Sequence, residues 1–278
     1  MAKALKHKNV PKFSKYKLKI AELCAIEAWN GIDYQTGKKM VIGDEELLKK
    51  FSASFLHLVK RKTKKSVINE SLIRILIKVA KMKALYRSTN PTDFNRGIRC
   101  LKNDITTFYK NYIKNKAPLL PIDYSIKAVL ELGEKFPKKN KKISINGNFR
   151  IPLATRVLFF TIPNMPFFNF SDGLAKKMNF QSRPQAAIPF FMKKLQKGLE
   201  KNKSLYKMTL PPSTELKRNL YNKIKKTDWW QRRVLDLALL FHFKIFKPHP
   251  KLIQNAAKIV WPIKTQIKQK HISNLKKI

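Results

Sequence analysis

Acidic residues, glycine and cysteine are all scarce in this chain of 278 residues. Only 17 Asp and Glu stand against 60 Lys and Arg, which gives a formal net charge of +43. Eight glycines leave no room for a glycine-rich phosphate-binding loop. The two cysteines, Cys24 and Cys100, and the five scattered histidines lack the spacing of a metal site. We therefore expect no metal and no other cofactor.

The charge predicts a polyanionic partner, because such an excess of positive charge repels itself in a compact chain. Nucleic acid is the first candidate, since neutralising phosphates releases counterions, and an anionic membrane surface is the second. No apolar run has the length of a membrane-spanning helix, and the basic start lacks the apolar core of a secretory signal. We expect a monomer that associates with nucleic acid in a bacterial-type cytoplasm and not with a membrane.

Apolar residues at helical spacing predict a mainly α fold of two packed helical layers. Strand signals are weak. We expect a basic N-terminal arm at 1–20, an N-terminal helical region at 21–140 and a second helical region with a basic tail at 141–278. The expected helices are 44–62, 70–87, 91–115, 121–136, 152–162, 169–179, 184–203 (interrupted by Pro189), 213–226 and one within 227–246.

One stretch, ATRVLFFTIPNMPFFNFSDGLAKKMN at 154–179, is the least basic and most aromatic part of the chain. With the preceding GNFRIPL and the later WWQRRVLDLALLFHF, it resembles the helix-hairpin-helix DNA glycosylases of the 8-oxoguanine glycosylase fold, over residues 140–245. The resemblance implies a hairpin at Gly147–Pro152, a helix at 154–162 and a turn at Pro163–Pro166. Nothing in residues 1–140 contributes to it.

The same resemblance implies a reaction. The catalytic Asp of the family falls on Asn169, and the next acid is Asp172. A carboxylate there stabilises positive charge on the sugar and helps water attack. Pro152 stands where lyase-type members carry a Lys nucleophile. The expected enzyme is therefore a monofunctional glycosylase that flips out and excises a modified base, for example in phage DNA as antiviral defence.

Contacts with DNA are expected from basic side chains near the implied hairpin and helix ends: Arg150, Lys139, Lys141, Lys142, Arg156, Arg232 and Arg233. Aromatic and polar residues are candidates for the pocket of an extruded base, because such pockets combine both kinds of group. They are Trp229, Trp230, Gln231, Phe168, Trp29 and Asp33.

Ordinary structural roles compete with these assignments. The five phenylalanines of 159–170 are typical core residues, and Asn169 and Asp172 are common helix caps. The Trp229–Trp230 pair suits a helix with one ring inward and one half exposed. Two other functions stay open: a non-catalytic DNA-binding protein of a mobile element on the same fold, and an RNA-binding protein.

Overall fold

The computed structural model describes residues 8–60, 70–79, 91–114, 121–135, 147–163, 165–180, 184–202 and 228–261. The prediction of a mainly α fold is confirmed: within these ranges the β structure is one isolated bridge between Ile32 and Lys39. None of the described helices is long and apolar enough to cross a membrane. The helices are α1 (Lys15–Trp29), α2 (Asp44–Lys60), α3 (Glu70–Val79), α5 (Pro91–Lys114), α6 (Pro121–Lys135), α7 (Gly147–Thr161), α8 (Asp172–Lys177), α9 (Pro184–Lys201), α11 (Trp229–His242) and α12 (Pro250–Val260).

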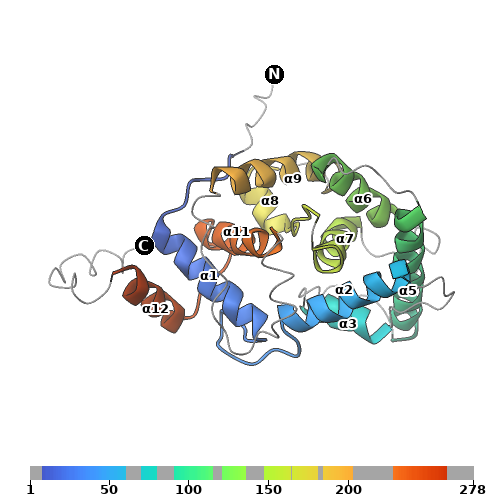
Figure 1. Ribbon diagram of the computed structural model, residues 1–278, viewed down its shortest axis with the longest axis horizontal. Coiled ribbons are helices and arrows are strands. Elements are labelled where there is room, and N and C mark those ends of the chain that lie inside the picture. The colour runs from blue at the N-terminus through green and yellow to red at the C-terminus, as the bar shows by residue number, and fades with distance from the viewer. Residues whose placement is uncertain are drawn as a thin grey trace, which may run out of the picture.

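Helices α7 and α11 lie in the middle of the molecule, with α1, α2, α6 and α9 around them (Figure 1). Helix α1 packs along α11 and α12, while α2 and α6 both pack against α7. One hydrophobic core runs from Val10 to Ala256. The regions expected to divide at residue 140 therefore share a single core.

The central place of α11 follows from its sequence. From Trp229 to Leu239 every residue except Gln231 is buried, and apolar side chains occur all round the helix. A helix without a polar face is stable only when neighbours cover it on all sides. Helix α7 is covered in the same way. The core role of the phenylalanines is confirmed, since all are buried: Phe159, Phe160, Phe167, Phe168 and Phe170.

Two expectations are wrong, the hairpin implied by the resemblance to DNA glycosylases and the interruption of a helix at Pro189. Residues Gly147–Pro152 do not form a hairpin but the first turns of α7, and Pro189 does not interrupt α9. Each proline is the sixth residue of its helix, so the missing N–H removes one helical hydrogen bond near the start. Burial of the apolar residues around them offsets that loss.

Other boundaries agree with the sequence in part. The helices expected at 44–62, 91–115 and 121–136 are confirmed within two residues. Helix α8 begins at Asp172 instead of residue 169. The expected helix 213–226 and residues 80–87 lie outside the described residues.

The N-terminal segment is fixed to the fold from residue 8. Helix α1 already begins at Lys15, inside the expected basic arm. Before it, the backbone N–H of Phe13 donates to Asn202 Oδ1 at 3.2 Å, and Lys194 Nζ donates to Asn9 Oδ1 at 2.7 Å. Val10 is buried against Gly198, where an added Cβ would lie 2.5 Å from its side chain. The segment 8–13 thus lies across α9.

A tight loop joins α1 to α2, and at Gly43 the backbone of this loop passes close to the end of α1. Helix α1 is capped by Asn30, with Gly31 in the left-handed region at φ +76°. A Cβ on Gly43 would lie 2.4 Å from the carbonyl oxygen of Trp29 and 2.6 Å from the Gly31 nitrogen. Neither backbone atom can move without disturbing the end of α1.

We expect Gly43→Ala to lower the free energy of unfolding by about 3 kcal/mol or more, as overpacking against backbone does. Gly173→Ala is the matched control, because its Cβ would have only ordinary contacts, the nearest at 3.8 Å. Urea unfolding followed by circular dichroism measures both. Equal stability of the two variants would contradict the close approach at Gly43.

Candidate functional site

A cluster of buried charges lies between α11 and the start of α2. Arg233 of α11 donates from Nε to Asp44 Oδ2 at 2.6 Å and from an Nη atom to Asp236 Oδ2 at 3.2 Å. Asn169 Nδ2 donates to the same Asp236 oxygen at 3.4 Å. All four residues are buried. The cluster therefore ties three segments together: the start of α2, the turn before α8 and α11.

Burial and mutual attraction set the protonation of the cluster. Burial raises the pKa of Asp236, and the positive charges of Arg233 and Arg156 partly offset this rise. Burial by itself would lower the pKa of Arg233, but Asp44 and Asp236 hold it above its ordinary value. Burial raises the pKa of the neighbouring Tyr34 to about 12. Arg233 is thus a fixed cation, and the stability of the cluster depends on it.

The predicted contact residues of α11 have internal partners. Trp229 Nε1 donates to the Phe159 carbonyl at 3.0 Å, and an Nη atom of Arg232 donates to the Pro163 carbonyl at 2.7 Å. Both tryptophan rings of the pair are buried, so the expectation that one of them would be half exposed is wrong. Gln231 is partly exposed. Both Arg232 and Arg233 are buried, and their hydrogen-bond partners belong to the protein itself.

The remaining predicted contacts have different surroundings. The Nε atom of Arg156 is buried without a hydrogen-bond partner among the described residues, and its guanidinium lies 5.8 Å from the Phe160 ring. Burial lowers the pKa of Arg156, and the nearby Arg233 lowers it further. Arg150 lies in the first turn of α7, but its side chain is outside the described part. Lys139, Lys141 and Lys142 are also outside it.

Asn169 and Asp172 are in unlike environments. Asn169 is 6% exposed and belongs to the buried cluster, where its Oδ1 has no hydrogen-bond partner among the described residues. Asp172 is partly exposed at the first position of α8. Burial raises its pKa, and Lys176 one turn later opposes the rise. Of the two candidate catalytic residues, Asp172 is the one that solvent and ligand can reach.

Three adjoining segments with exposed lysines meet at α8, which begins at Asp172. The backbone N–H of Lys8 donates to the Met178 carbonyl at 3.0 Å, and Lys8 Nζ lies 6.0 Å from the Phe243 ring. Gly173 lies beside Ile245, since a Cβ on it would be 3.8 Å from that side chain. We call the exposed lysines of these segments the α8 lysine face: Lys8, Lys176, Lys177, Lys244 and Lys247.

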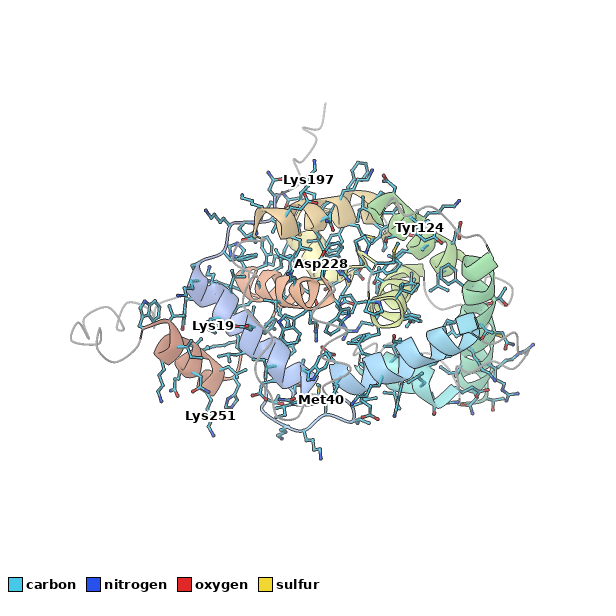
Figure 2. All side chains as sticks on the ribbon, viewed as in Figure 1. Lys19, Met40, Tyr124, Lys197, Asp228 and Lys251 are labelled. Atoms are coloured by element: carbon cyan, nitrogen blue, oxygen red, sulfur yellow. The ribbon has the colours of Figure 1, made fainter. Side chains whose placement is uncertain are left out.

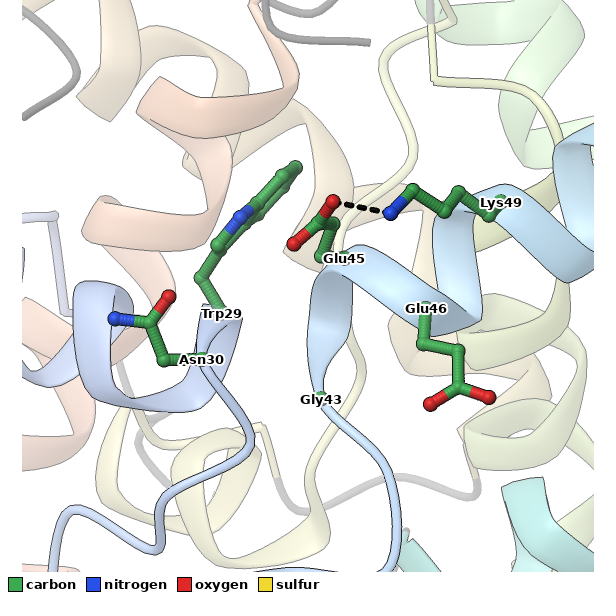
Figure 3. Close-up of a pocket in the computed structure, with 6 residues that line it drawn as sticks. All are labelled: Trp29, Asn30, Gly43, Glu45, Glu46 and Lys49. Carbon is green, nitrogen blue, oxygen red and sulfur yellow. Dashed lines mark hydrogen bonds and ion pairs between the residues drawn. The ribbon is translucent and has the colours of Figure 1, made fainter. Parts of the chain in front are cut away.

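A separate pocket of about 320 Å³ opens where α1 ends and α2 begins (Figure 3). The Trp29 ring faces the Glu45 carboxylate across it, and Glu45 is ion-paired with Lys49. Trp29 Nε1 is buried without a hydrogen-bond partner among the described residues. Ligand pockets start at about 300 Å³, so a single ring system is the largest suitable guest. The other lining residues are Asn30, Gly43 and Glu46.

The predicted base-pocket residues do not form one pocket. Trp29 lines the cavity just described, and its ring contacts those of Trp229 and Trp230 at 5.8 and 6.0 Å between centroids. Phe168 is buried in the core. Asp33 accepts the backbone N–H of Gln35 at 2.8 Å and is not part of the pocket lining.

Sequence reasoning missed Asp44 as the partner of Arg233, and it missed the lysines around α8. A signal existed for an internal partner of Arg233, because a buried charge is usually paired, but it did not point to Asp44 in particular. None existed for the lysines, since Lys and Arg together number 60. Comparisons with protein family models, with curated proteins and with solved structures find no match.

Proposed function

We propose that this protein binds double-stranded DNA through exposed lysines, and that the α8 lysine face is part of the contact surface. The observation that supports this is how the charges are distributed between interior and surface. Three acids, Glu22, Asp44 and Asp236, are buried. Glu45, Glu46 and Asp123 are ion-paired with lysines. Much of the small acidic content is thus neutralised locally.

Many of the described lysines, by contrast, are exposed, and they lie on different parts of the molecule. Lys197 of α9 and Lys251 of α12 lie at separate places on the outside (Figure 2). A surface of this kind attracts polyanions without regard to base sequence, because phosphate contacts carry no sequence information. The resemblance to DNA glycosylases favours DNA over RNA as the polyanion. We place this function in a bacterial-type cytoplasm.

The α8 lysine face provides the test. We expect the double variant Lys176→Gln/Lys177→Gln to bind a 20-base-pair duplex more weakly, with the slope of log affinity against log salt reduced by about 2. Lys127→Gln is the control, because Lys127 lies 3.8 Å from Glu131 on α6 and its charge is already compensated. Fluorescence anisotropy at several salt concentrations measures both. Equal slopes for the double variant and the native protein would exclude this face.

Excision of a modified base is the second candidate function, favoured by the position of Asp172. Its carboxylate is partly exposed at the start of α8, and Lys176, one of the lysines that would contact DNA, acts on it from one turn later. In such a reaction the bond between sugar C1′ and the base breaks, water adds to C1′ after losing a proton, and the base leaves protonated. A carboxylate beside C1′ stabilises the positive charge that develops there. The substrate we favour is a modified base in foreign DNA.

We expect Asp172→Asn to abolish base release while DNA affinity stays equal or rises, since one negative charge is removed. Alkali-induced strand cleavage of phage DNA and of synthetic DNA with modified bases measures release. Asn169→Asp is the second variant to measure in the same assay. It would add a carboxylate beside the buried Asp236, so we expect lower stability and no gain in release. Absence of release by the native protein from every DNA tested would leave DNA binding alone, the non-catalytic alternative.

A further inference from the structure

Trp261 differs from the other tryptophans of the chain. The four tryptophans all lie in described residues, and Trp29, Trp229 and Trp230 are at most 5% exposed. Trp261 follows α12 and is 42% exposed. Its ring packs on Tyr16 of α1, with 4.8 Å between the ring centroids and 37° between the ring planes. The Trp261 ring is therefore exposed to solvent while it packs against a second aromatic ring, that of Tyr16.

Both rings are held by helices. Helix α12 lies along α1, and the end of α12 is near the start of α1 (Figure 1). The Tyr16 hydroxyl donates to the Ile253 carbonyl at 3.5 Å, and the backbone N–H of Trp261 donates to the Ala257 carbonyl at 2.8 Å. The Tyr16–Trp261 pair is thus a positioned platform and not a side chain on a free tail.

The exposed charged side chains next to this platform along the chain are lysines. Lys258 is exposed three residues before Trp261, and Lys12 and Lys15 are exposed just before Tyr16. The sequence contains no acidic residue from 8 to 21 and none from 237 to the end. A flat aromatic surface with lysines beside it matches a strand whose bases are unpaired, because the base stacks while the phosphates meet the cations.

We propose that the Tyr16–Trp261 platform binds an unpaired base of single-stranded DNA. The inference rests on the proposed DNA binding and makes it more specific. In a duplex both faces of each base are covered by the neighbouring base pairs, so a duplex cannot use the platform except at a frayed end. DNA with an unpaired segment should therefore bind more tightly than fully paired DNA of the same charge.

Two titrations test this with the full chain. In the first, the oligonucleotide dT16 is added while intrinsic tryptophan fluorescence is followed. We expect quenching in the native protein and none in Trp261→Phe, since the other three tryptophans are buried. In the second, anisotropy gives affinities for labelled dT16 and for a blunt 16-base-pair duplex. We expect Trp261→Ala to weaken dT16 binding about 10-fold, within the range for losing one stacked base, and to change duplex affinity less than twofold.

Ile259→Ala is the matched control, because Ile259 is 54% exposed at the same end of α12 but has no ring. It should leave dT16 affinity unchanged. Equal losses in Ile259→Ala and Trp261→Ala would identify an apolar surface for a protein or a membrane and overturn the proposal. So would equal losses for dT16 and duplex, or tighter binding of the RNA oligomer U16 than of dT16. Steep, salt-dependent duplex binding with no effect of Trp261→Ala would overturn this inference alone, whereas no binding of either DNA would overturn the proposed function as well.

Discussion

Affinity for duplex DNA is expected to fall about 10³–10⁵-fold between about 50 and 200 mM salt, as it does for proteins that neutralise about 6–10 phosphates. The reason is the net charge of +43 together with the lysines that are exposed in the described part of the chain. Each phosphate neutralised releases condensed counterions, and added salt opposes that release. Anisotropy of a labelled duplex over this salt range gives the slope directly.

Two controls make the salt experiment decisive. Circular dichroism at both salt concentrations must show the same helical content, so that loss of affinity is not loss of fold. A second duplex of unrelated sequence should give the same slope, because contacts to phosphate are blind to sequence. A slope near zero would contradict a phosphate-based interface. A large difference between the two sequences would instead indicate contacts to base edges.

Local patterns predicted most of the described helices. Apolar residues at helical spacing and acids at the start identified α2, and Pro91 marked the first residue of α5. The boundaries failed where proline or glycine was read as a breaker. Gly147, Pro152 and Pro189 all lie within helices, because packing of α7 and α9 in the core outweighs local preference.

The candidate site was much harder to predict, because it depends on residues far apart in the sequence. Arg233 and Asp44 are 189 positions apart, and no local spacing links them. Arginines next to tryptophans suggested a DNA contact, yet α11 has no polar face and is covered on all sides. The apolar pattern of α11 predicts that neighbouring helices cover it, and a covered Arg233 needs a partner inside the protein. It does not tell which carboxylate is that partner.

The buried cluster is also where a single substitution should cost the most stability. Arg233 is the only residue shown to donate to both Asp44 and Asp236 within the described part of the chain. Removing one partner of a buried ion pair leaves an uncompensated charge, which typically costs about 3–5 kcal/mol. Total stabilities of domains are about 5–15 kcal/mol, so such a loss is a large part of the whole.

We therefore expect Arg233→Met to lower the free energy of unfolding by about 3–5 kcal/mol, measured by urea denaturation. Arg232→Met is the matched control on the same helix. Arg232 is equally buried but donates to a backbone carbonyl, and burial lowers its pKa to about 10, so its loss should cost only about 1–3 kcal/mol. The double variant Asp44→Leu/Arg233→Met should regain part of the stability lost in Arg233→Met, because it removes a carboxylate together with its partner. Equal costs for the two arginines, or a double variant less stable than Arg233→Met, would show that the Arg233–Asp44 pair does not hold α2 to α11.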